Sequence, residues 1–361
     1  MNGLSTAISD AGSAIGRYFS LVSFVPSLFL VSFTFTLIKS GALGGSGELD
    51  WAMAGDAFTH VGNLALLTLL SIALGVIVHP IQFAIVQFFE GYWGIGRLAQ
   101  RVRVSRISHH YRRFRFLKFD CYLEAIGEIQ EADEHKTKEI QEADEQKVEL
   151  GPKARIKLLS IADESARLLN GYPTRDDDIM PTRLGNVLRR YERLAGSQYG
   201  LDAVTAIRHV AFMAPPERIG YLNDQRQQLD LAVRMSATSI AATLIAIGFL
   251  WQHGPWLLIA LAPYGIAYLS YRGAITAAHE YGAAVSAIMD LDRFALYDYL
   301  RMHRPKSTAD ERRRNAQLMR LLGQGPLGYD PRIVVLPYEY RDASTGTDKD
   351  PTGTDKGQAA T

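Results

Sequence analysis

The segment of residues 57–90 is too apolar and too poor in charge to be a core helix of a water-soluble protein. Residues 64–78 hold no charged side chain. About 20 apolar residues, at a rise of about 1.5 Å each, are enough to span the hydrocarbon of a bilayer. The segment therefore predicts a membrane-crossing helix. Its second half differs from an ordinary span because it carries several polar residues and a helix breaker: His79, Pro80, Gln82, Gln87 and Glu90.

Three other stretches have the length and composition of a span: residues 19–38, 235–251 and 256–271. Hydrophobic residues make up 47% of the 361 residues and charged residues 21%, so spans and water-exposed segments must share the chain. We predict an all-α, polytopic membrane protein with four transmembrane helices in two hairpins and a cytoplasmic helical domain between them. A cleaved signal peptide is the alternative for residues 19–38, but that run is longer than the usual apolar region of about 7–15 residues.

Basic residues directly after the second span orient the chain. Eight arginines and lysines lie in residues 97–118, with no acidic residue between Gly91 and Phe119. Residues 39–57, by contrast, hold one lysine and three acidic side chains. The positive-inside rule then places both termini and the central segment in the cytoplasm. This predicts a multi-pass protein of the cell inner (plasma) membrane.

The predicted division of the chain follows from these spans and their flanks. The segments are an N-terminal cytoplasmic segment (1–18), the first span (19–38), an outer loop (39–56), the second span (57–89), a cytoplasmic helical domain (90–234), the third span (235–251), the fourth span (256–271), further cytoplasmic helices (272–322) and a C-terminal segment with a disordered tail (323–361). Residues 128–149 repeat an 11-residue unit. A period of 11 corresponds to about 3.67 residues per turn and predicts an exposed, extended helix or a coiled coil.

Residues 97–118 alternate basic and apolar residues in a pattern typical of a helix at the inner leaflet. The apolar residues expected to share one broad face are Leu98, Val102, Ile107, Tyr111, Phe114 and Leu117. One interpretation is a topology signal on a solvated helix. The other is contact with anionic lipid at the inner leaflet, worth at most roughly 1 kcal/mol per side chain. The side chains for this contact are Arg101, Arg103, Arg106, Arg112, Arg113, Arg115 and Lys118.

Two further expectations concern the same basic segment. His109 and His110 are neighbours in the run and are expected to face solvent or lipid headgroups. No nucleic-acid partner is predicted, because the arginines lie close to the bilayer and no folded recognition motif accompanies them.

His79, Gln82 and Glu90 are spaced so that they lie on one face of the second span. Ionisable groups within a span are functional candidates, because exposing them to lipid is costly. The face is either interfacial and used in packing, or it lines an ion pathway. A pathway would require several copies of the chain, because four helices with one polar stripe do not enclose a pore. That interpretation therefore includes a homo-oligomer.

The sequence contains no recognisable catalytic signature. There is no Ser/His/Asp, Cys/His, Walker or zinc-helix pattern, and Cys121 is the single cysteine. Three adjacent aspartates at 176–178 lack the alternating spacing of a calcium loop, and they are expected to oppose the positive end of a helix at residues 181–195. We therefore predict no catalytic, cofactor-binding or metal-binding residues, no cofactor, and a protein that is not an enzyme.

Short motifs distributed along the chain carry a resemblance to other proteins. They are HPIQ at 79–82, EGYW at 90–93, PTRLGN at 181–186, YGLDA at 199–203, YG at 281–282 and DLDR at 290–293. In these motifs the chain resembles a group of uncharacterised actinobacterial integral membrane proteins with four spans. The resemblance implies the same membrane architecture and lends no activity.

A large part of the chain is assigned to cytoplasmic helices, and no catalytic constellation accompanies them. The function predicted from the sequence is a non-enzymatic, membrane-anchored scaffold or sensor whose cytoplasmic helical domain binds a protein partner. The alternative is an oligomeric ion channel or pore lined by the polar face of the second span.

Overall fold

The computed structural model describes residues 19–43, 49–139 and 151–323. Within these ranges every regular element is a helix, which confirms the all-α fold class. Three helical segments are long and apolar enough to cross a membrane: Val22–Lys39, Val61–Glu90 and Pro216–Leu250. These helices indicate a membrane protein. The end of the 11-residue repeat and the predicted tail lie outside the described residues.

The helices follow one another with short connections. In the first half they are η1 (Phe19–Phe24), α2 (Val25–Lys39), α3 (Trp51–Asp56), α4 (Val61–Val78), η2 (His79–Ile81), α5 (Gln82–Glu90), α6 (Arg97–Arg115), η3 (Phe116–Leu123) and α7 (Glu124–Glu139). In the second half they are α8 (Pro152–Leu169), η4 (Asp176–Asp178), α9 (Arg183–Leu194), η5 (Ser197–Tyr199), α10 (Ala203–Met213), α11 (Pro216–Leu250), η6 (Gly254–Ala260), α12 (Leu261–Tyr299) and α13 (Thr308–Leu322).

The second membrane-length segment changes helix type where its polar residues begin. α4 ends at Val78, a 3₁₀ turn follows, and α5 starts at Gln82. Pro80 explains the change, because proline has no N–H to donate to the carbonyl four residues earlier. The sequence predicts a span over 57–89 with a helix breaker in its second half. The helix begins at Val61, later than predicted, and its α-helical form is interrupted at Pro80.

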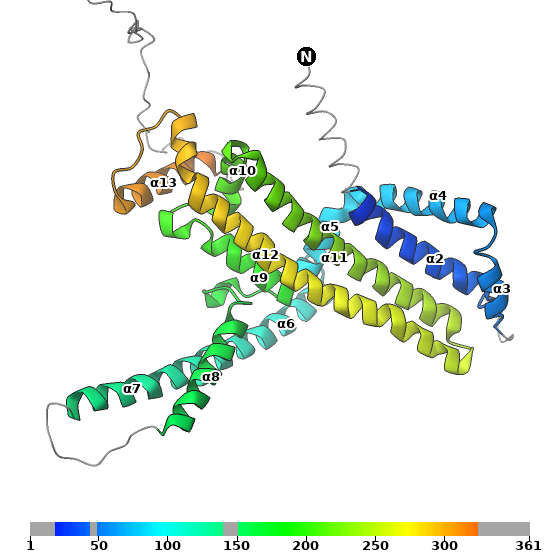
Figure 1. Cartoon of the computed structure of the whole chain (residues 1–361), viewed down its shortest axis with the longest axis horizontal. Helices are drawn as coiled ribbons and strands as arrows, with labels where there is room; N and C mark the ends of the chain where they lie inside the picture. The colour runs from blue at the N-terminus through cyan, green and yellow to red at the C-terminus, as the bar shows by residue number, and fades with distance from the viewer. Residues whose placement is uncertain (1–18, 44–48, 140–150, 324–361) are drawn as a thin grey trace, which may run out of the picture.

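α11 and α12 lie side by side and antiparallel as the central pair of the molecule (Figure 1). Ala242 and Ala246 of α11 are both 0% exposed, and the Ser236 hydroxyl donates to the Ala267 carbonyl of α12 at 3.1 Å. Small side chains let helices approach closely, which matters in lipid, where little hydrophobic force drives helices together. α2 also packs against α11, so the apolar ends of these helices form one bundle.

The other half of α12 organises a helical body, in which α9, α10 and α13 pack around it (Figure 1). Met289, Leu296 and Tyr297 of α12 and Leu318 of α13 are fully buried at its core. α11 and α12 contain 35 and 39 residues, or about 52 and 58 Å. A bilayer needs only about 30 Å, so both helices are long enough to join the bundle to the body without a break.

A second part outside the bundle is an arm formed by α6, η3 and α7, which continue into one another and run away from the α11 and α12 pair (Figure 1). α8 packs back along the arm. Phe114 and Leu117 of the arm are buried against Tyr172 and Ile179, which follow α8. The arm therefore has a small core of its own.

This core corrects the apolar face predicted for the basic segment. Ile107, Tyr111, Phe114 and Leu117 pack inward against α8 and the residues that follow it, whereas Leu98 and Val102 are 76% and 52% exposed. The reason is helical geometry. Phe114 lies 16 residues after Leu98, which corresponds to about 160° around an α-helix.

The helix expected at 181–195 begins later than its proline suggests. α9 starts at Arg183, and the Thr182 hydroxyl caps it by accepting from the Gly185 N–H at 2.9 Å. The aspartates before it do not oppose its positive end as expected. The Asp178 carboxylate instead binds Arg193, in the last turn of α9, at 2.8 Å. The ion pair between Asp178 and Arg193 therefore places this carboxylate beside the last turn of α9 rather than at the start of the helix.

Candidate functional site

A buried polar cluster joins the three membrane-length segments. Arg234 of α11 is 0% exposed. Its Nε donates to Gln82 Oε1 of α5 at 2.6 Å and its Nη1 donates to Ser23 Oγ of η1 at 2.5 Å. Gln82 Nε2 donates in turn to the Asp230 carbonyl at 3.2 Å. A buried charge needs such hydrogen bonds to offset its lost hydration, so this cluster fixes how the segments meet.

The structure places the predicted polar face of the second span in three different environments. Gln82 is 7% exposed and belongs to the buried cluster. His79 is exposed in the 3₁₀ turn. Glu90 is half-buried at the end of α5. The amide of Gln82 is engaged within one copy of the chain, so an ion pathway along this face stays a prediction resting on His79 and Glu90.

The end of α5 packs directly against the start of α9. Thr182 Oγ1 donates to the Glu90 carbonyl at 2.9 Å. A Cβ on Gly185 would lie 2.1 Å from that carbonyl oxygen, and one on Gly91, which has φ +106°, would lie 2.2 Å from Pro181 Cγ. Only glycine fits either position. Packing therefore explains the glycines of the EGYW and PTRLGN motifs.

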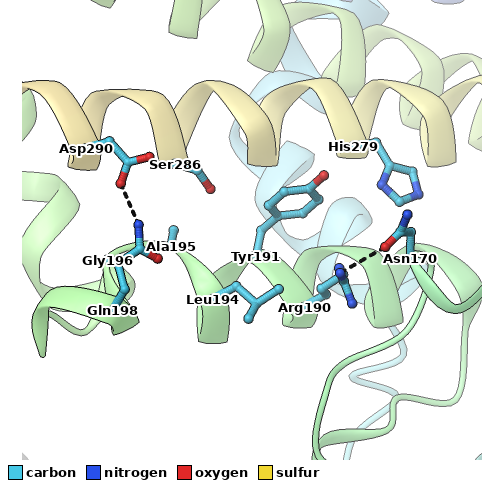
Figure 2. A pocket seen from close by; sticks show the side chains of 10 residues that line it. All are labelled: Asn170, Arg190, Tyr191, Leu194, Ala195, Gly196, Gln198, His279, Ser286 and Asp290. Carbon is cyan, nitrogen blue, oxygen red and sulfur yellow. Dashed lines mark hydrogen bonds between the residues drawn. The ribbon is translucent and has the colours of Figure 1, made fainter. Parts of the chain in front are cut away.

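A cavity of about 450 Å³ opens between α9, η5 and α12 in the helical body. Figure 2 shows side chains from both helices lining it, with His279, Arg190 and Asn170 towards one end and Asp290 and Gln198 towards the other. Its complete lining is Asn170, Arg190, Tyr191, Leu194, Ala195, Gly196, Gln198, His279, Ser286 and Asp290. The sequence predicts none of these as site residues, because they come from segments about 100 residues apart.

The polar groups of this cavity largely bind one another. Arg190 Nη2 donates to Asn170 Oδ1 at 3.0 Å, and Gln198 Nε2 donates to Asp290 Oδ1 at 2.9 Å (Figure 2). The Ser286 hydroxyl donates to the Gly282 carbonyl at 3.0 Å. A polar solute in the cavity would therefore bind only through the donors and acceptors that these hydrogen bonds leave unused.

Burial lowers the pKa of His279, and the nearby Arg190 lowers it further while Glu280 opposes them. The imidazole is therefore neutral at pH 7, and its ring meets that of Tyr191 edge-on at 6.0 Å between centroids. Among the side chains that line the cavity, the Ser286 hydroxyl donates to a backbone carbonyl rather than to a basic side chain.

The predicted lipid-contact residues line the arm, outside its core. Arg101, Arg106, Arg112 and Arg115 are exposed, while Arg103, Arg113 and Lys118 are half-buried. Two aromatic rings organise the end of the segment. Lys118 lies over Phe114 at 5.3 Å from the ring centroid, and Arg115 lies over Phe119 at 5.4 Å.

His110 is not at the surface, contrary to the expectation from its basic neighbours. It is 2% exposed, and its Nδ1 lies 3.1 Å from the Tyr172 hydroxyl. Burial lowers the pKa of His110 to about 4, helped by the charges of Arg106, His109, Arg183 and Arg113. The signal was present in the sequence, because His110 precedes the buried Phe114 by one helical turn.

Within the described ranges, no three His, Cys, Asp or Glu side chains come together in a way that suits a metal ion. In its described residues, the chain belongs to the class of all-helical proteins and has three helices long and apolar enough to cross a membrane. Comparison with protein-family models, curated proteins and solved structures finds no match for this chain.

Proposed function

We propose that the chain is a four-span membrane protein that acts as a non-enzymatic scaffold or sensor through its cytoplasmic helical domain. The observation that carries this proposal is the continuity of α11 and α12. α11 runs unbroken through 35 residues and α12 through 39. The apolar bundle and the helical body, which is the cytoplasmic body of this proposal, therefore form one packed unit. A protein bound to that body would be held at the membrane.

The fourth crossing is assigned to residues 256–271, which include the start of α12. Antiparallel packing beside α11 supports it (Figure 1). Large apolar side chains in this part point outward, as lipid contact requires, although tyrosines make it less apolar than the other three segments. Those that are more than half exposed are Leu258 at 67%, Leu261 at 61%, Tyr264 at 60%, Tyr268 at 54% and Leu269 at 68%.

The partner surface is proposed on α10, in the cytoplasmic body. Phe212 is 92% exposed, and Val204 on the same helix is 48% exposed. An aromatic side chain left almost wholly in water is suited to anchor a protein contact, because aromatic residues are enriched among the residues that dominate binding energy at interfaces. The cavity of Figure 2 lies in the same body, and a small ligand there is the way in which a sensor would alter the contact.

Site-specific photo-crosslinking tests this proposal. A photoreactive phenylalanine analogue is placed at Phe212 in the full chain, in its native membrane. We expect one discrete crosslinked protein that is absent when the analogue replaces Met53, which is 58% exposed on α3. Crosslinks from position 212 to lipid or to the chain itself alone would contradict the scaffold proposal.

A further inference from the structure

One face of α6 is not covered by the rest of the arm or by α8, and it carries both apolar and basic side chains. Leu98 and Val102 of α6 are 76% and 52% exposed, and Phe116, which follows α6 as the first residue of η3, is 55% exposed and continues the same face. At about 100° per residue they lie within about 40° of one another. This exposed α6 face points away from Phe114, which belongs to the core of the arm. Its first residue, Leu98, lies eight residues after Glu90, where the second membrane-length segment ends.

The charge along this face is not neutralised within the described part of the chain. Several arginines elsewhere bind carboxylates, as in the pairs Arg193 with Asp178, Arg218 with Asp292, and Arg293 with Glu311. In contrast, no described carboxylate lies within 4.0 Å of an α6 arginine. Arg101, Arg106 and Arg112 are exposed on the flanks of the face. The face therefore presents net positive charge beside apolar side chains.

A hollow at the membrane-proximal end of α6 adds a site for a phosphate group. It has a volume of about 530 Å³ and is lined by Arg97, Gln100, Arg101, Val104 and Ser105. A guanidinium binds phosphate oxygens through two parallel N–H groups, and such charge-assisted bonds are about twice as strong as neutral ones. The amide and the hydroxyl supply further donors. This combination matches a phospholipid headgroup.

We propose that the exposed α6 face docks onto the anionic inner leaflet of the membrane that holds the spans. Leu98, Val102 and Phe116 enter the boundary between headgroups and acyl chains, and the arginines bind lipid phosphates. An amphipathic helix of this kind buries its apolar face about 5–10 Å deep. The occupant is identified by its charge and by the short connection from α5. The inference rests on the membrane crossing in the proposed function.

An environment-sensitive fluorophore on the docked face tests this. In the full chain with Cys121→Ser, Val102→Cys carries the fluorophore, and the protein is reconstituted in nanodiscs of phosphatidylcholine with or without phosphatidylglycerol. We expect a blue shift and quenching by a spin-labelled lipid in the discs with phosphatidylglycerol, and loss of both at high salt, which screens charge beyond about 3 Å. The matched position is Ile156→Cys on α8, 67% exposed, where no shift is expected.

Charge variants complete the test. Replacing three arginines together, as Arg97→Gln, Arg101→Gln and Arg112→Gln, should lower the equilibrium constant for docking by roughly a hundredfold. Each arginine near an anionic surface contributes about a factor of five. The matched triple Arg208→Gln, Arg301→Gln and Arg320→Gln, all exposed in the cytoplasmic body, should leave the signal unchanged. An equal signal in both kinds of disc overturns the anionic contact, and no signal in either overturns docking. A chain that does not enter discs contradicts the membrane crossing itself.

Discussion

At the scale of single residues, the buried polar side chains say more about how the helices pack than the exposed ones do. Arg234, Gln82 and His110 are each less than a tenth exposed, and each is held by hydrogen bonds to a different helix or loop. Losing a partner in such a place costs about 1–3 kcal/mol, and more for a charge. These residues therefore determine the packing of the elements around them.

His110 makes the stability of the arm depend on pH. Its pKa is about 4 when folded and 6.5 ordinarily, so the unfolded chain binds the proton first as pH falls. Stability is then complete above pH 6.5 and is lost as the pH falls towards 4, by up to about 1.4 kcal/mol per pH unit. Thermal unfolding of the full chain should give a lower melting temperature at pH 5 than at pH 7.5. In His110→Gln the difference between the two melting temperatures should be smaller.

The matched control is His60→Gln, because His60 is exposed, lies 50 residues earlier and does not act on the pKa of His110. This variant should keep the pH dependence of the original chain. An unchanged pH dependence in His110→Gln would contradict the assignment to this buried imidazole.

At the scale of elements, close contacts between helices depend on glycine. Gly282 of α12 faces α9, where a Cβ would lie 2.1 Å from the Tyr191 ring. The same tyrosine lines the cavity of Figure 2. A methyl group at this point must therefore push α9 away from α12 and reshape the cavity.

Gly282→Ala should destabilise the chain by about 1–3 kcal/mol, the usual cost of overpacking a core. For a protein of this size the melting temperature falls by about 2–4 °C per kcal/mol. Gly273→Ala on the same helix is the control, because its Cβ would meet nothing within 4 Å. We expect it to be neutral or slightly stabilising, since alanine restricts the unfolded chain. Equal melting temperatures for the two variants would rule out the close contact.

Much of the element pattern could be predicted from the sequence, and what could not depended on neighbours distant in the chain. Uninterrupted hydrophobicity is enough to predict three membrane-length segments. Which side of α6 faces inward depends on Tyr172 and Ile179, which the sequence of α6 does not contain. Likewise, the cavity and the buried cluster unite residues about 100 to 200 positions apart, and no local periodicity reports such contacts.

At the scale of the whole molecule, the number of membrane crossings determines which surfaces share a compartment. With four crossings, the turn after α11 faces outward, and the end of α12 returns to the side of the arm. Gln252 and Tyr299, both exposed, then lie in opposite compartments. In the proposed topology, the basic arm, the cavity and Phe212 would all share the cytoplasmic side.

Cysteine labelling checks this topology. In the Cys121→Ser background, Gln252→Cys should react with a membrane-impermeant maleimide in intact spheroplasts, and Tyr299→Cys only after lysis. The single native cysteine makes both variants simple to prepare. Equal labelling of the two positions before lysis would show that residues 256–271 do not cross the membrane.

The buried cluster also sets an order of events during synthesis. Arg234 binds Gln82 and Ser23, which precede it by 152 and 211 residues. At about 5–20 residues per second, the ribosome needs roughly 8–30 s to reach Arg234 after Gln82 has emerged. Through that interval the first two helical segments must wait in the insertion machinery or the bilayer with their polar groups unmatched. Arrival of the third segment completes the bundle, so a nascent chain truncated before it should be recognised as incomplete by membrane quality control.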